Sequence, residues 1–109
     1  MATHERRRVG AGLFALVLVL VALTSSGCGG TIYAITANSA QSRLDTAKAL
    51  GAEKYAPYEF WYAHEHLQKA MEEAAAADYG DAIDFADTAE EYAEKAINLS
   101  KQAHEGAGR

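Results

Sequence analysis

The feature that most constrains this chain is an unbroken apolar run near its N-terminus. The eleven residues Leu13–Leu23 are all apolar, a basic stretch (4–8) precedes them, and small residues (24–27) follow. This order of basic, apolar and small residues is typical of a secretory signal peptide. A membrane-spanning helix needs roughly 20 apolar residues, and this run is shorter. The pattern therefore predicts a removable export segment over residues 1–27.

The only cysteine of the chain, Cys28, stands directly after the small residues. The segment 23–28, with the sequence LTSSGC, resembles a lipobox, the processing site of bacterial lipoproteins. Ser26 and Gly27 match the small residues of that pattern, whereas Ser25 stands where an aliphatic residue is more frequent. The resemblance implies that the signal is cut before Cys28, which then carries a diacylglycerol and an N-acyl chain.

The resemblance also implies where such an anchor would lie. In lipoproteins of Gram-negative bacteria, an aspartate after the cysteine favours the inner membrane, and this chain has Gly29 there. We therefore expect a lipid-anchored protein of the cell envelope, in the outer membrane and facing the periplasm. Two alternatives stay open: an uncleaved N-terminal anchor, and a twin-arginine signal at Arg6 and Arg7.

Charge and cysteine content limit the partners of the remaining chain. From Cys28 onward there are seven basic and fourteen acidic residues, a formal charge of −7. Such a domain is a poor partner for nucleic acid. A single cysteine excludes intrachain disulfides and multi-cysteine zinc sites. The expected partners are the membrane, through the lipid anchor, and an envelope protein or a second copy of the chain.

The sequence from Cys28 onward favours helices. Twenty of these 82 residues are alanine and only Pro57 is proline, a composition that favours helix over strand. Apolar residues recur at spacings of three and four, as on one face of a helix. We expect a domain over residues 31–105 with three helices, at about 31–50, 57–77 and 81–105.

Flexible segments are expected on both sides of this domain. Residues 28–30 are predicted to be the lipidated cysteine and a Gly-Gly tether, and residues 106–109 a flexible tail. Between the helices, Gly51 should end the first in a left-handed conformation. Pro57 should occupy the first turn of the second helix, and Asp81 should cap the third.

The predicted core follows the apolar stripes of the three helices. The candidate core residues are Tyr33, Ala37, Ala40, Leu44 and Ala47; Phe60, Ala63, Leu67, Ala70, Ala74 and Ala77, with Met71 beside them; and Phe85, Tyr92 and Leu99 next to Ala82, Ala89, Ala96 and Ala103. Alanines set among larger residues let helices approach closely. The predicted fold class is all-α: a slender antiparallel three-helix bundle, preceded by a cleavable signal helix. Aspartate at Leu67 or Phe85 should unfold it.

An aromatic segment provides the candidate contact surface. Five of the eight residues Tyr55–Tyr62 are aromatic. On a helix they cannot all face one core, so Tyr58, Trp61 and Tyr62 are candidate partner contacts. Packing around the loop between the first two helices is the alternative.

The remaining polar groups do not form a recognisable catalytic or metal site. His64 and His66 are two residues apart and lie on different helix faces, so a metal would need ligands from another element. Carboxylates along a helix at Asp81, Asp84, Asp87, Glu91 and Glu94 do not converge as in a calcium loop. The sequence shows no nucleophile–base pair and no cofactor fingerprint. We therefore expect no enzyme, no metal and no cofactor other than covalent lipid.

Residues 31–104 resemble an uncharacterised helical domain of Gram-negative lipoproteins. The resemblance is carried by Ala-Pro-Tyr-Glu-Phe at 56–60 and by Ala63, Leu67, Lys69-Ala70, Glu73, Asp78-Tyr79 and Ala82. In some relatives this domain is joined to an OmpA-like peptidoglycan-binding domain. A tetratricopeptide repeat matches less well, because only one repeat unit would fit and stacked repeats need about three.

These observations predict a non-enzymatic envelope lipoprotein that acts as a structural or protein-interaction module. The alternative is a module that binds peptidoglycan or a soluble periplasmic ligand through residues 55–62.

Overall fold

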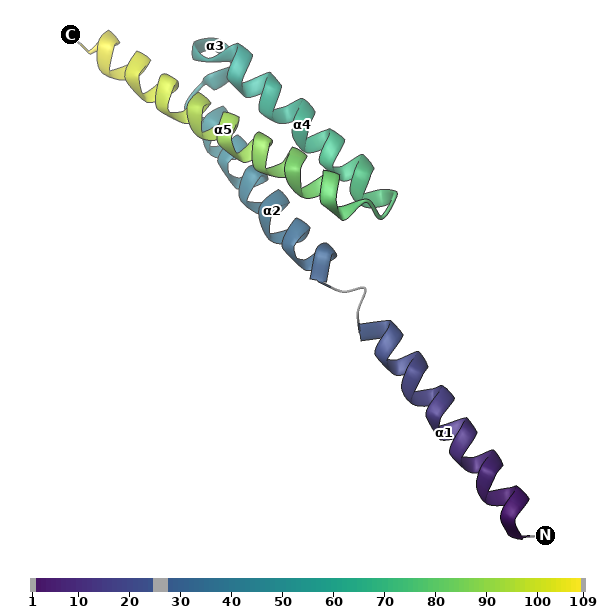
Figure 1. Ribbon diagram of the computed structural model, residues 1–109. Helices are drawn as coiled ribbons and strands as arrows, with labels where there is room; N and C mark the ends of the chain where they lie inside the picture. Colours follow the sequence, from purple (N-terminus) through teal and green to yellow (C-terminus); the bar gives the residue numbers. More distant parts are fainter. Residues whose placement is uncertain (1, 25–27, 109) are drawn as a thin grey trace.

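The computed structural model describes residues 2–24 and 28–108, and these parts contain helices and no strand. The helices are α1 (Ala2–Thr24), α2 (Cys28–Ala49), α3 (Ala52–Tyr55), α4 (Pro57–Ala75) and α5 (Tyr79–Ala107). The predicted all-α class is confirmed. Figure 1 shows α2, α4 and α5 side by side, with α4 running opposite to the other two, and α1 leading away from them.

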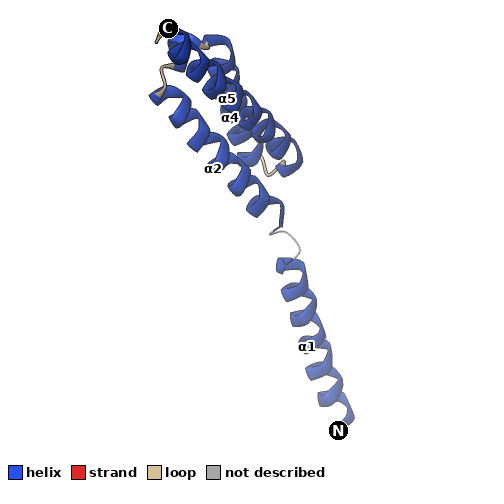
Figure 2. Cartoon of the chain, turned by 90° about the vertical axis from the view of Figure 1, so that its left-hand side faces the viewer, coloured by secondary structure: helices blue, strands red, loops and turns tan. Residues whose placement is uncertain are grey.

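Helix α1 holds the basic and apolar parts of the predicted export segment in one continuous helix. It contacts none of the other described helices, and the molecule is accordingly elongated, 93 × 20 × 15 Å (Figure 2). Apolar side chains such as Phe14 and Leu18 are more than half exposed. Within residues 2–24 and 28–108, no helix combines the length and the apolarity needed to cross a bilayer. The small residues 25–27 lie outside the described parts.

The start of α2 differs from the expected tether. Gly29 and Gly30 belong to the first turn of this helix, which begins at Cys28. A Cβ atom on Gly29 would lie 3.0 Å from the Cβ of Tyr79, a tight contact, so the close approach of α5 favours glycine here. The helix is held at this end by packing that the local sequence does not reveal.

The C-terminal tail also begins later than expected. Gly106 and Ala107 are helical, and Gly108 caps α5. Helix α5 is therefore the longest of the described helices, at 29 residues. Residue 109 lies outside the described part of the chain.

The connection between α2 and α4 contains an additional short helix, α3, where we expected a simple loop. Gly51 has a φ of 79° and ends α2 as predicted, and α4 begins at Pro57 as predicted. His104 of α5 donates a hydrogen bond from Nε2 to the Leu50 carbonyl at 2.9 Å. The Tyr55 and His104 rings meet edge-on, 5.0 Å between centroids. These contacts join the connection to α5.

The turn between α4 and α5 holds a strained alanine. Ala77 has a φ of 61°, in the left-handed region. Asp78, and not Asp81, caps α5: its Oδ1 accepts a hydrogen bond from the Asp81 backbone N–H at 3.3 Å. A left-handed conformation costs a residue with a Cβ atom about 1–2 kcal/mol.

We predict that Ala77→Gly stabilises the protein. Removing the Cβ relieves the left-handed strain, and the added freedom of the unfolded chain offsets part of the gain, so the net effect is roughly 0.5–1 kcal/mol. The matched control is Ala76→Gly, because Ala76 is also exposed but has a φ of −83°. Urea unfolding should show a higher midpoint for Ala77→Gly and a lower one for Ala76→Gly. An equal decrease of the urea midpoint in both variants would contradict the left-handed strain at Ala77.

The core is built mainly from alanine. Helix α5 lies against both α2 and α4 and buries a column of small residues between them. The buried residues of α5 are Ala82, Ala86, Ala89, Ala93, Ala96, Ile97 and Ser100, and those of the facing helices are Ala40, Leu44 and Ala47 of α2 and Phe60, Ala63, Leu67 and Ala70 of α4. Alanine lets the helix backbones approach closely, which explains how so few large side chains fill the interior.

Three predicted large core residues of α5 lie at its flank instead. Phe85 and Tyr92 are half-buried, and Leu99 is exposed. The alanine column of α5 faces the line between α2 and α4. Phe85, Tyr92 and Leu99 therefore point toward the edge of α4. Ala77, also expected in the core, is exposed because it lies in the turn. The buried position of Leu67, 3% exposed, is as predicted.

Candidate functional site

Cys28 lies at the end of the helical body nearest α1 (Figure 1). It is the first residue of α2, and its thiol is free and exposed. A modifying enzyme working at a membrane surface could therefore reach the sulfur without unfolding the body. The predicted lipidation site is thus accessible in the folded chain.

The aromatic segment forms a groove on the outer side of α4. The groove has a volume of about 630 Å³ and a mostly apolar surface. Its lining residues are Pro57, Tyr58, Trp61, Tyr62, Glu65 and His66. They form two rows at four-residue spacing, which places them on one side of the helix. The groove thus brings together the three predicted contact residues.

The three predicted residues differ in exposure. Tyr58 is 63% exposed and Trp61 is 47% exposed, whereas Tyr62 is half-buried. Trp61 meets the ring of Phe60 edge-on at 5.1 Å, and Phe60 is buried in the core. Tyr55 lies apart from the groove, against His104. Tyr58 and Trp61 are therefore the side chains most available to a partner.

A stack of rings supports the groove from below. Tyr62 stacks on His66 at 4.1 Å and packs on Tyr92 of α5 at 4.2 Å. His66 donates from Nδ1 to the Tyr62 carbonyl at 2.9 Å. The Lys95 ammonium lies 4.2 Å from the centre of the Tyr92 ring. Aromatic and cation–π contacts of this kind orient rings, so contacts within the protein hold the rings at the base of the groove.

Lys95 is also held by an acidic neighbour. Its ammonium donates to Glu91 at 2.6 Å, and this hydrogen bond is the main cause that raises the pKa of Lys95 above its ordinary value. Because the folded pKa is raised, the pair stabilises the fold fully below the ordinary lysine pKa. That contribution is lost as the pH rises through the raised pKa, in alkaline solution.

A polar cluster joins α2 to α5. The Arg43 guanidinium donates from Nε to Glu90 at 3.0 Å and from Nη1 to Glu94. Ser39 adds a hydrogen bond from its hydroxyl to Glu90 at 2.8 Å. The hydrogen bond to Glu94 is the main cause that raises the pKa of Arg43. The carboxylate of Glu94, one of the acidic residues spread along α5, therefore takes part in a helix-to-helix contact.

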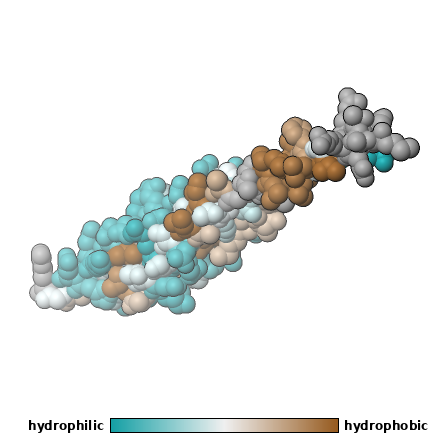
Figure 3. Space-filling view, turned by 90° about the horizontal axis from the view of Figure 1, so that it is seen from below, coloured by the Kyte–Doolittle hydropathy of each residue, from teal (hydrophilic) through white to brown (hydrophobic). Residues whose placement is uncertain are grey.

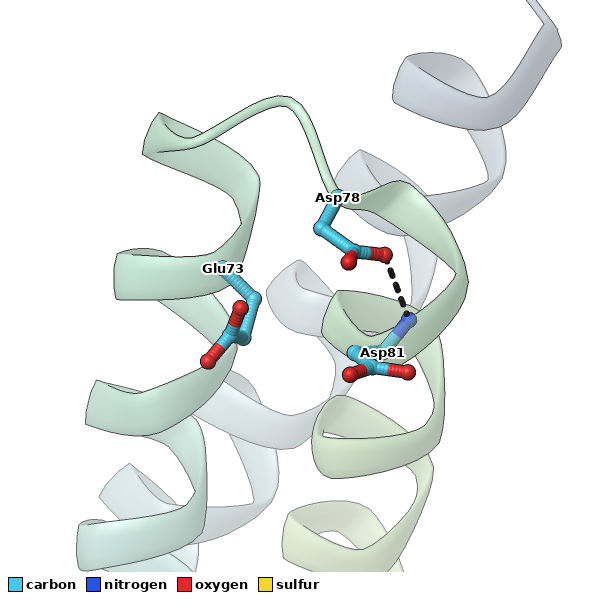
Figure 4. A group of neighbouring side chains, drawn as sticks. All are labelled: Glu73, Asp78 and Asp81. Atoms are coloured by element: carbon cyan, nitrogen blue, oxygen red, sulfur yellow. Dashed lines mark hydrogen bonds between the residues drawn. The ribbon is translucent and has the colours of Figure 1, made fainter.

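Three carboxylates gather at the turn between α4 and α5. Oxygens of Glu73, Asp78 and Asp81 lie within 4.8 Å of one another (Figure 4). Asp78 and Asp81 are exposed, and Asp78 is occupied as the cap of α5. Negative charge is favourable at a helix N-terminus. Capping thus accounts for Asp78, and Glu73 is paired with the Lys69 ammonium at 2.9 Å.

The two histidines of the aromatic segment face different neighbours. His66 is stacked on Tyr62, whereas His64 lies beside Trp61, with ring centroids 5.4 Å apart. Among the described residues, neither belongs to a group of three potential metal ligands. The structure therefore brings no further ligand to the His64-Glu65-His66 segment.

Fold and site together define a class: an all-α domain with an alanine-rich core and an aromatic groove on one side. Residues 36–107 match the family described as a domain of unknown function, DUF4398. The chain belongs to this family. The matched region includes the groove and the Arg43 cluster, and Cys28 precedes it. No curated protein and no solved structure matches the chain. Lipid attachment and the link to OmpA-like domains stay predictions.

Proposed function

We propose that this protein is a non-enzymatic lipoprotein of the cell envelope. Diacylglycerol and an N-acyl chain on Cys28 hold it in the outer membrane, facing the periplasm. The observation that carries the proposal is the position of Cys28, exposed at the start of α2 and directly after the apolar export pattern. Each buried methylene contributes ~0.8 kcal/mol, so two or three acyl chains suffice for stable anchoring.

The independence of α1 supports removal of residues 1–27. Helix α1 has no contact with the other described helices, so its loss takes no packing from the core. In this proposal α2, α4 and α5 remain as a slender antiparallel three-helix bundle. Its acidic surface serves as a structural or interaction module for an envelope protein or a second copy.

The first experiment compares the wild-type chain with Cys28→Ser in cells. The wild type should incorporate labelled palmitate and migrate at its mature size. The variant should carry no label and keep the precursor size, because neither lipid transfer nor the following cleavage can occur. Asn38→Ser, at an exposed position of the same helix, is the matched control and should behave as wild type. Unchanged labelling and size in Cys28→Ser would contradict the proposal.

A second candidate function is binding of peptidoglycan or a soluble periplasmic ligand in the aromatic groove. The observation that favours it is the pair of exposed rings, Tyr58 and Trp61, over a base of packed rings. Aromatic side chains combine large contact area with a polar tip, and they are frequent binding hot spots.

Trp61 is the only tryptophan, so its fluorescence reports on this groove. Soluble cell-wall fragments should shift the emission in a saturable way. Tyr58→Ala should weaken binding by about tenfold or more if Tyr58 is a hot spot. Gln68→Ala is the matched control, because Gln68 is exposed on α4 but does not line the groove. No saturable change with wild type would argue against this second function.

A further inference from the structure

We infer that the first two turns of α2 lie against the lipid bilayer through one face of the helix, formed by Cys28, Ile32 and Ile35. We call these three residues the Ile32 face. The inference rests on the proposed lipid anchor and goes beyond it, because it says how the helical body is oriented on the membrane. The three residues precede the region that matches the family.

The Ile32 face is apolar and exposed. Ile32 is 52% exposed and Ile35 is 68% exposed, although both are large and hydrophobic. They follow Cys28 by four and seven residues, the spacing that places side chains on one side of a helix. The packed side of α2 carries Ala40 and Leu44 instead. Acyl chains on Cys28 and the two isoleucines therefore leave the helix on the same side.

The two isoleucines lie close to Cys28 along the helix. Because Cys28 is already helical, no flexible tether separates the sulfur from the isoleucines. At 1.5 Å per residue, Ile32 lies ~6 Å and Ile35 ~10 Å from Cys28 along the axis. Interfacial helices bury their apolar face roughly 5–10 Å into the boundary between headgroups and acyl chains. With the acyl chains inserted, a tilted α2 brings both isoleucines to that boundary.

The distribution of charge favours a bilayer as the occupant of this face. The chain has no charged residue from Cys28 to Ser42. Acidic residues lie at the same end of the body, at the turn between α4 and α5 that holds Glu73 and Asp78, because Tyr79 beside this turn lies against Gly29. An anionic headgroup layer repels such carboxylates. Contact through the uncharged face of α2 keeps them away from the membrane surface.

The helix that precedes α2 also favours a bilayer as the occupant of the Ile32 face. Helix α1 exposes apolar side chains such as Leu18 and Leu20, and α2 is the next helix in the chain. Figure 3 shows hydrophobic surface on α1 and only small hydrophobic patches on the largely hydrophilic body. Before cleavage, an export segment in the membrane brings Cys28 and the next two turns to the membrane surface.

The test measures which side of α2 meets lipid. The full chain, expressed in bacteria and purified from membranes, is reconstituted into vesicles of phosphatidylethanolamine and phosphatidylglycerol. Ile35→Cys and Ala34→Cys each receive a fluorophore on the introduced thiol, since lipid blocks the thiol of Cys28. Ala34 is the matched control. It is also exposed and lies next to Ile35 along the helix axis, but its side chain points to a different side of α2 from the Ile32 face.

We expect a nitroxide on the lipid to quench the label at position 35 roughly threefold more than at position 34. Iodide in the water should show the reverse order. Equal nitroxide quenching at both positions would overturn the inference and leave the lipid anchor standing. Weak quenching of position 35 by both nitroxide and iodide would show that protein covers the Ile32 face. This result would also overturn the inference. A reactive thiol at Cys28 in the unsubstituted chain would overturn both proposals.

Discussion

We expect Leu67→Asp to unfold the helical body at neutral pH. Leu67 lies on α4, is 3% exposed and belongs to the same buried cluster as Phe60 and Ala63. Losing a buried leucine costs about 2–5 kcal/mol in transfer and cavity terms. An unpaired buried carboxylate costs several kcal/mol more. Small domains are stable by only about 5 kcal/mol, so the sum exceeds what holds this fold together.

Far-UV circular dichroism of the purified chain measures this result. The Leu67→Asp protein should lose most of its helical signal at 25 °C and show no cooperative melt. Gln68→Asp introduces the same side chain at the next residue, which is exposed, and should keep a cooperative transition close to that of wild type. A folded Leu67→Asp protein with an unchanged melt would mean that α4 does not pack as described.

Ala93→Leu is the second large effect, and it tests the alanine column. Ala93 is 0% exposed on α5 and belongs to the core cluster together with Leu44 and Ala47 of α2. Extra methylene groups in a close-packed interface force the helices apart and cost about 1–3 kcal/mol. In a domain of this size that lowers Tm by roughly 5–20 °C.

Helix propensity cannot explain such a loss, because leucine is nearly as good a helix former as alanine. The matched control is Gln102→Leu, an exposed position of α5. Thermal melts should show the decrease for Ala93→Leu and little change for the control. An unchanged Tm for Ala93→Leu would show that α5 is loosely packed against its neighbours.

Several elements follow directly from local sequence. Gly51 ends α2 because glycine adopts a positive φ without a steric penalty, and Pro57 begins α4 because its missing N–H is harmless in a first turn. The spacing of Ala40, Leu44 and Ala47 correctly predicted the buried side of α2. These predictions succeed because the relevant energies arise within a few residues of the chain.

Other features depended on contacts between distant segments. The seven-residue repeat of Phe85, Tyr92 and Leu99 indicated a core stripe, but those residues lie at the flank of α5. A seven-residue repeat indicates that residues share one face of a helix. It does not indicate which face is buried, and here α5 meets two helices at once through its alanines. Similarly, Gly29 and Gly30 suggested a tether because nothing nearby in sequence shows that Tyr79 packs on them.

The residues of the candidate sites also divide into those that local sequence indicates and those that depend on distant contacts. The aromatic content of residues 55–62 predicted Tyr58, Trp61 and Tyr62, and Pro57 and His66 could have been added from their four-residue spacing to Trp61 and Tyr62. No local signal pointed to Tyr92 beneath Tyr62. The Arg43 cluster was also missed, because its partners on α5 are 47 and 51 residues away.

By itself, the sequence determined the helical class, the order of export pattern and cysteine, and the positions where several helices begin and end. These properties depend on intrinsic preferences and on side chains within one or two turns. Only the tertiary structure decided that alanines form the centre of the core and that Cys28 begins a helix without a tether. It also decided which aromatic rings stay exposed. Such features depend on how closely distant backbones approach, and that distance is set by all the packed side chains together.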